Sequence, residues 1–128
     1  MKKLMGSVVA LTLMAGVANA DPALGRWQSE PGESGGYILV DIAMCGARLC
    51  GTIANVVGND NTSIVGRRII ENMGKNGATE YAGGTIWAPD TDKTYRSKME
   101  LLNANTLEVS GCVAGGLICR GQTWTRVN

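Results

Sequence analysis

From Thr94 to Leu102 the polarity of the chain alternates residue by residue. One alternating set is Tyr95, Ser97, Met99 and Leu101, and the other is Arg96, Lys98 and Glu100. Because successive side chains of a β-strand point to opposite faces, this stretch predicts a strand with one buried face and one solvated face. Strands of this kind belong to antiparallel sheets, so the chain must contain further strands that pair with this one.

Similar short segments recur between turns along the whole chain. The predicted strands are residues 24–29, 37–44, 49–57, 80–88, 94–102, 106–112 and 118–127. Residues 64–73 fit either a strand or one helical turn, and residues 58–63 and 72–79 are predicted loops. Eighteen glycines and the absence of a long helical period favour an all-β domain. About eight strands in up-and-down order predict a small antiparallel barrel, with a two-sheet sandwich as the alternative.

The first 20 residues have the features of a secretory signal peptide. Lys2 and Lys3 precede the apolar stretch of residues 4–17, and Ala18-Asn19-Ala20 has the small-x-small form of a cleavage site. The apolar stretch is shorter than the roughly 20 residues that span a membrane. The sequence therefore predicts cleavage after Ala20 and a periplasmic or secreted protein. Its mature form, residues 21–128, would be a single domain with no membrane span.

Charge and residue types argue against several functions. Without Lys2 and Lys3, ten basic side chains face eleven acidic ones, which leaves no positive field to attract nucleic acid. The chain has no His, the commonest general base, so an enzyme is not expected. Asp90 and Asp92 form a close carboxylate pair, but Pro-Asp-x-Asp-Lys is typical of a turn. No cofactor is predicted.

Four cysteines in an exported chain predict two disulfides. Cys45 and Cys50 flank a four-residue loop, and Cys112 and Cys119 flank a six-residue loop. Residues facing each other across an antiparallel pair are roughly 4.5–5.5 Å apart, which suits a disulfide and favours these two local pairs. A cross-pairing between the two hairpins is the alternative. The spacings and the lack of His fit a four-cysteine zinc site poorly, so no metal is predicted.

Three segments together carry a resemblance to a known family. They are MCGARLCG at residues 44–51, IWAPDTDKTY at 86–95 and GCVAGGLICRGQTWTRV at 111–127. Their order and spacing resemble the bacterial exported family called domain of unknown function 2147, with residues 58–79 matching only in being rich in loops. The resemblance implies a lipocalin-like, calycin-type barrel in the periplasm or outside the cell. It implies no established activity.

Gly25-Arg26-Trp27 resembles the Gly-x-Trp of the first lipocalin strand. The resemblance implies that an arginine of the last strand packs on this tryptophan, and Arg126 is the natural candidate. Such a cation–π contact is worth ~0.5–2 kcal/mol and would plug one end of the barrel. Trp27 and Arg126 are therefore interpreted as residues of the fold.

The last predicted strand suggests a ligand site. Arg120, Gln122, Trp124 and Arg126 alternate along it, so all four share one face. If that face points inward, a barrel with an apolar wall would hold a small apolar or amphipathic ligand with an acidic head. The candidate ligand-binding residues are Arg120, Gln122, Trp124, Tyr95 and Met99. If the face points outward, Arg120 and Gln122 are simply solvated.

Two binding functions follow from these patterns. A carrier needs a connected internal cavity of roughly 300 Å³ or more. Its apolar wall is predicted from Ile38, Val40, Ile42, Met99, Leu101, Leu107 and Val109, and Met44 shares the face of Ile42. The alternative is a protein-binding module, such as an inhibitor or cell-envelope interaction factor, that uses its loop end. Ile64 and Val65 are the predicted contacts for that alternative.

Overall fold

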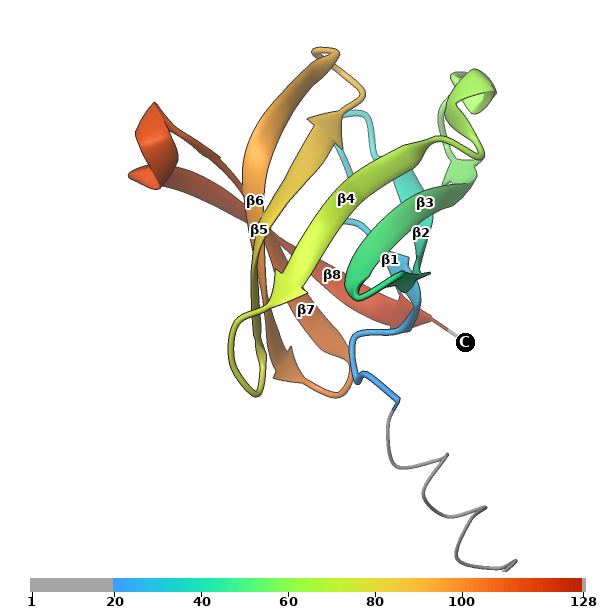
Figure 1. Cartoon of the computed structure of the whole chain (residues 1–128). Coiled ribbons are helices and arrows are strands. Elements are labelled where there is room, and N and C mark those ends of the chain that lie inside the picture. The colour runs from blue at the N-terminus through green and yellow to red at the C-terminus, as the bar shows by residue number, and fades with distance from the viewer. Residues whose placement is uncertain (1–19, 128) are drawn as a thin grey trace, which may run out of the picture.

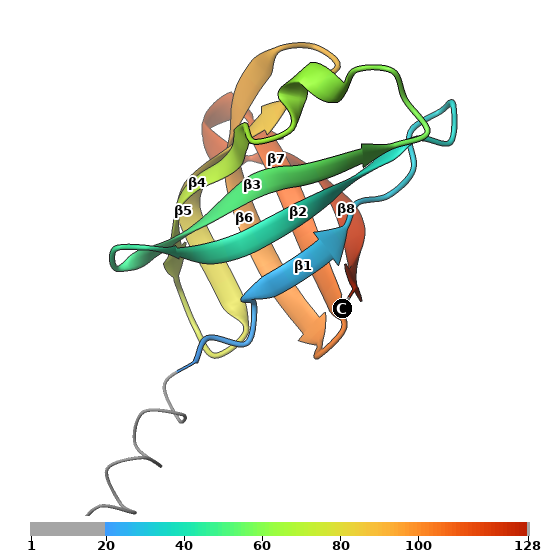
Figure 2. The same ribbon diagram turned by 90° about the vertical axis from the view of Figure 1, so that its right-hand side faces the viewer.

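Eight antiparallel strands close into one barrel in the computed structural model, which describes residues 20–127 (Figures 1 and 2). They are β1 (Gly25–Gln28), β2 (Tyr37–Cys45), β3 (Arg48–Val57), β4 (Arg68–Lys75), β5 (Glu80–Ala88), β6 (Lys93–Asn103), β7 (Thr106–Val113) and β8 (Ile118–Val127). Each strand pairs with the next, and β8 pairs with β1. The predicted up-and-down barrel is confirmed, and the sandwich alternative is wrong.

Large side chains fill the interior of the barrel. The most completely buried of them are Trp27, Trp124, Tyr81, Ile53, Ile70, Met73, Leu107 and Val40. They come from seven strands, and along most strands they alternate with exposed or half-buried neighbours, as a closed sheet of eight strands requires. The interior is therefore a packed core.

The region between β3 and β5 differs from its prediction. Thr62–Ile64 forms a short 3-10 turn, η1, and the strand that follows runs to Lys75, into the predicted loop. The pairing of β3 with β4 shifts register on both sides of Gly51, and the adjacent residues Ile69 and Ile70 are both buried. A β-bulge breaks the period-two alternation of a strand, which explains why the pattern in the sequence was ambiguous.

Met44 also departs from its prediction. Val40 and Ile42 of the same face are buried, but the side chain of Met44 is 49% exposed. It lies near the tip of the β2–β3 hairpin, which extends beyond the neighbouring strands in Figure 2. A residue past the rim has no interior to face, whatever its register.

The two disulfides join Cys45 to Cys50 and Cys112 to Cys119. Each closes the hairpin predicted for it, between β2 and β3 or between β7 and β8. The predicted local pairing is confirmed, and all four cysteines are engaged, which excludes the cross-pairing and the zinc site.

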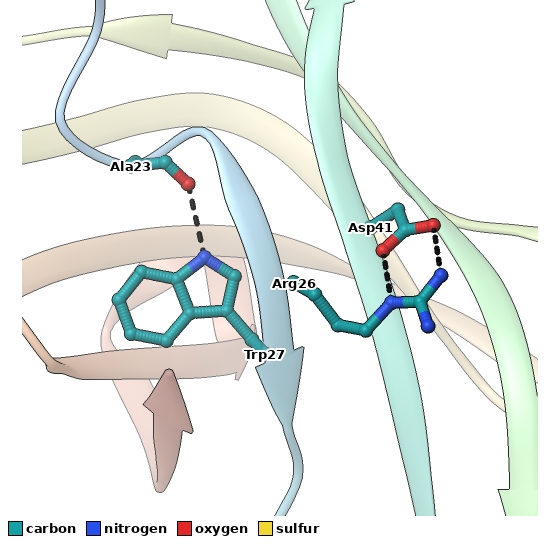
Figure 3. A network of polar contacts seen from close by, with 4 residues as sticks. All are labelled: Ala23, Arg26, Trp27 and Asp41. Atoms are coloured by element: carbon teal, nitrogen blue, oxygen red, sulfur yellow. Dashed lines mark hydrogen bonds and ion pairs between the residues drawn. The ribbon is translucent and has the colours of Figure 1, made fainter. Parts of the chain in front are cut away.

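The segment before β1 covers one end of the barrel. Trp27 is fully buried, and its indole N–H donates a hydrogen bond to the Ala23 carbonyl at 3.0 Å (Figure 3). The Arg126 guanidinium lies 4.3 Å from the centre of the Trp27 ring. It also donates to the carbonyls of Leu24 at 2.8 Å and Pro22 at 2.6 Å. The last strand thus holds the segment that precedes the first, and this end is closed.

Among the described residues, Asp21 is the first whose side chain is bound to the barrel. Its Oδ1 accepts hydrogen bonds from the Tyr81 hydroxyl at 2.7 Å and from the Ala23 N–H at 2.8 Å. Lys75 Nζ lies 3.5 Å from its Oδ2. The predicted signal peptide falls almost entirely in residues 1–19, outside the described residues. From residue 20 to residue 127, no helix is long and apolar enough to cross a bilayer.

Candidate binding site at the open end

The strand β8 leaves the barrel wall part-way along its length. It pairs with β7 along nearly its whole length but with β1 only at Thr125, Arg126 and Val127. Residues 118–124 therefore have a neighbouring strand on one side only. Figure 1 shows the resulting β7–β8 arm, residues 111–123, projecting from the barrel with the short turn η2 (Ala114–Gly116) at its tip.

The predicted polar stripe lies on the inward side of this arm. Arg120, Gln122 and Trp124 lie opposite Gly111, Val109 and Leu107 in the register of β7 and β8. Val109 and Leu107 belong to the core, so the stripe shares their face. Trp124 is 2% exposed, whereas Arg120 and Gln122 are exposed to solvent. The sequence left two alternatives, an inward face that contacts a ligand and an outward face that is solvated. The face points inward, but Arg120 is still solvated because the arm that carries it has left the wall.

Buried and exposed members of the stripe are joined by one hydrogen bond. The Trp124 indole N–H donates to Oε1 of Gln122 at 2.9 Å. A buried tryptophan N–H needs such a partner, and the bond also orients the Gln122 amide. The guanidinium of Arg120 makes no hydrogen bond or ion pair within residues 20–127.

Tyr95 lies on the same side of the sheet. A Cβ placed on Gly111 would lie 3.6 Å from Tyr95 Cβ and 3.4 Å from Ile86 Cγ2. Both side chains are half-buried, and Gly111 leaves space between them and β8. Ile38 and Val56, paired with each other near this end of β2 and β3, are also half-buried against the core. The open end therefore presents apolar surface beside the stripe.

The five predicted ligand residues fall into two groups. Arg120 and Gln122 are exposed and Tyr95 is half-buried, so these three are accessible. Met99 and Trp124 are 3% and 2% exposed and belong to the sealed core. A ligand at the open end would touch the first group and rest above the second.

The structure does not supply the internal cavity that the carrier hypothesis required. Two hollows, of about 250 and 430 Å³, lie against β5, β6 and β7, with Lys98 on both walls and the core residues Tyr81 and Met99 in the wall of the smaller one. Large side chains occupy the interior instead. The packing of residues 20–127 therefore favours a ligand laid across the open end over one enclosed within the barrel.

Asp92, one member of the Asp90–Asp92 pair, belongs to a loop contact that the sequence did not reveal. The Trp87 indole N–H donates to Asp92 Oδ1 at 2.8 Å, and Arg67 stacks 3.4 Å from the centre of the Trp87 ring. Trp87 and Asp92 are five residues apart, on either side of a turn. Nothing in the Pro-Asp-x-Asp-Lys segment indicated that Arg67 would stack on Trp87. The turn interpretation of the two aspartates agrees with this contact.

Apolar exposure on the loop end is concentrated on the arm. Leu117 is 87%, Ile118 64% and Val113 47% exposed. Ile64, one of the two residues predicted for a protein contact, instead packs against the core, and its neighbour Val65 is 45% exposed. Exposed apolar groups at a turn are hard to predict, since only the three-dimensional path of β8 shows that nothing covers them.

A family model described as "Uncharacterized protein conserved in bacteria (DUF2147)" matches residues 25–126. The chain belongs to the DUF2147 family. Among solved structures, the DUF2147 barrel is similar to protein HP1028 of Helicobacter pylori, which is described as belonging to the lipocalin family. The TM-score is 0.66 and the identity 18%, over 82% of each chain. At this identity the similarity establishes a lipocalin-like fold alone, and a search of curated proteins found no match.

Proposed function

We propose that this protein binds a small amphipathic molecule across the open end of its barrel and catalyses no reaction on it. The observation that carries the proposal is Arg120, which faces inward by register yet remains exposed and makes no ion pair within residues 20–127. An acidic head group would pair with its guanidinium, since charge-assisted bonds from arginine to carboxylate are among the stronger polar contacts. The apolar part would lie over Tyr95 and Ile86.

The filled interior limits how much of the ligand is covered. Trp124 and Met99 close the floor, so an apolar chain would be covered only where it lies across the open end. The hydrogen bond from Trp124 leaves the Gln122 amide N–H groups as donors for the same head group. The site is thus an open cup, and a modest affinity is expected.

We further propose that the protein works outside the cytoplasm, in the periplasm or after secretion. Two disulfides support this, because such bonds persist in oxidising compartments. The predicted cleavage site after Ala20 directly precedes Asp21, the first side chain bound to the barrel. Cleavage there would leave the closed end intact.

The test is titration with a medium-chain carboxylate, decanoate, by isothermal calorimetry. Arg120→Ala should weaken binding roughly tenfold, the order expected for one charge-assisted contact. Arg96→Ala is the matched control, because Arg96 is an exposed arginine on the outer face. Equal decanoate affinity of the wild type and Arg120→Ala would remove Arg120 from the site. Native mass spectrometry of the protein isolated from its own cell envelope would reveal a natural ligand.

The exposed arm favours a second candidate function, a protein-binding module. Leu117 and Ile118 form an apolar tip on a disulfide-closed hairpin, and exposed apolar patches often mark interaction sites. In that case the double substitution Leu117→Ser and Ile118→Ser would abolish capture of an envelope protein that wild type retains. Decanoate binding, which depends on Arg120, would be unchanged in this variant, so the two functions are separable.

A further inference from the structure

Three glutamates form a row across the outer face of β5, β6 and β7. Glu80 is the register partner of Glu100, and Glu100 is the register partner of Glu108. All three are exposed, and none makes an ion pair within residues 20–127. Like charges directly opposite each other on antiparallel strands destabilise a sheet. The folded barrel therefore carries a repulsion that a bound cation would relieve.

The row borders the hollow of about 250 Å³ on this face. Its wall contains the three glutamates together with Asn76, Ala82 and Lys98, and the core residues Tyr81 and Met99 also line it. Lys98 contributes one positive charge against three carboxylates, so the hollow is negative overall. It is separate from the open end, because none of Arg120, Gln122 and Tyr95 lines it.

Ser110 supplies an independent sign of a ligand. It lines the same hollow and is only 7% exposed, yet its hydroxyl has no hydrogen-bond partner among residues 20–127. No side-chain nitrogen or oxygen that is sealed from solvent in this part of the chain lacks a partner. The Ser110 hydroxyl must therefore open into the hollow, where it offers an unused hydrogen-bonding group next to Glu108.

We propose that this hollow binds an aliphatic polyamine, with ammonium groups on the glutamates and one N–H donated to the Ser110 hydroxyl. The three glutamates lie on adjacent strands whose backbones are roughly 4.8 Å apart, which is close to the spacing of amines joined by three or four methylenes. A linear cation matches this row better than a metal ion, since no group of three acidic residues between residues 20 and 127 is gathered to hold one. This site is independent of the function proposed for the open end.

Binding is expected to stabilise the folded protein, because the ligand recognises a row that exists only in the closed sheet. The probe is spermidine, measured by thermal unfolding and by calorimetry at low ionic strength. The melting temperature of wild type should rise with spermidine concentration. Magnesium chloride at equal ionic strength should raise it less, because a small hydrated ion cannot bridge the row.

The decisive variant is Glu100→Gln, which removes the central charge and both repulsions. Without ligand its melting temperature should be higher than that of wild type by roughly 4 °C. Its affinity for spermidine should be about fivefold weaker. Glu33→Gln, in the exposed loop between β1 and β2, removes the same charge elsewhere and should leave spermidine binding as in wild type.

Three results would overturn the proposal. One is equal spermidine affinity in wild type and Glu100→Gln. Another is an equal loss in Glu33→Gln, which would indicate attraction to the overall charge. The third is a wild-type amide spectrum in which spermidine shifts no resonance of Ser110 or its neighbours. If the neighbours of residue 110 no longer shift with spermidine in Ser110→Ala, while the fold is retained, the contact with the hydroxyl would be supported.

Discussion

At the scale of single residues, Tyr81 shows how burial and a charge act on one hydroxyl. Its ring is in the core, and its O–H donates to the Asp21 carboxylate at 2.7 Å. Burial, followed by this hydrogen bond and the negative charge of Asp21, raises the pKa of Tyr81 above its ordinary value. Ionising Tyr81 would place a second negative charge against Asp21, so the folded barrel keeps the hydroxyl neutral.

This gives a prediction for alkaline pH. Because the pKa of Tyr81 is raised by folding, its contribution to stability is complete below the unfolded-state pKa near 10 and is lost as pH rises towards the folded-state pKa. Wild type should therefore lose more free energy of unfolding than Tyr81→Phe between about pH 8 and about pH 11. Urea unfolding at both pH values measures the difference. At the lower pH the variant should be about 1 kcal/mol less stable, from the lost hydrogen bond. Parallel pH profiles would contradict the assignment to Tyr81.

At the scale of elements, the β7–β8 arm depends on its disulfide more than the β2–β3 hairpin does. Residues 118–124 pair with β7 alone, so Cys112–Cys119 is the covalent link that keeps the arm together beyond the wall. In β2, by contrast, residues up to Ile42 also pair with β1. Reduction of the two bonds should therefore have different local consequences.

The prediction compares Cys112→Ser/Cys119→Ser with Cys45→Ser/Cys50→Ser. In the chain-entropy model each double variant loses roughly 2–2.5 kcal/mol, since both closed loops are short. Hydrogen exchange should distinguish the two double variants, because only the first loses the disulfide of the arm. Amides of residues 113–123 should exchange much faster in the first variant, while those of Leu107 and Val109 change only with global stability. Arm amides that stay equally protected in both variants would show that the arm does not need its disulfide.

The same elements show what the sequence could predict. Alternation identified β6 and most of β7 because these residues lie in the wall, where the period of two decides burial. It left β4 open between a strand and a helical turn, because a bulge buries Ile69 and Ile70 in succession. It also placed Arg120 and Trp124 on one face, but it could give neither the direction of that face nor the exposure of Arg120. That exposure depends on where β1 stops pairing with β8, and this is set by contacts between the two ends of the chain.

At the scale of the whole molecule, the barrel has one closed end and one open end. At the closed end, Arg126 connects the last strand to the segment that leads into the first. At the open end, β8 separates from β1 and presents Arg120. The proposed ligand site therefore lies away from the contacts that close the sheet. Substitutions at Arg120 should then weaken ligand binding with little effect on stability. Substitutions at Arg126 should lower stability with little effect on ligand binding.

The final prediction tests this division through Arg126→Ala. The substitution removes hydrogen bonds to the carbonyls of Pro22, Leu24 and Ala104 and the stacking on Trp27. Because hydrogen bonds from a charged group are worth more than neutral ones, we expect a loss of roughly 3 kcal/mol in urea unfolding. That is a large share of the roughly 5–15 kcal/mol that stabilises a typical domain.

A matched control is Arg26→Ala, which breaks the exposed pair with Asp41 in the neighbouring strand (Figure 3). Exposed pairs contribute at most about 1 kcal/mol, so this variant should remain close to wild type. Arg126→Lys should recover little of the loss, because one ammonium group cannot match the forked donors that reach separate carbonyls. If Arg126→Ala and Arg26→Ala lost equal stability, closure of the barrel would have to come from strand pairing and Trp27 burial alone. Only the three register pairs between β1 and β8 would then hold the first and last strands together.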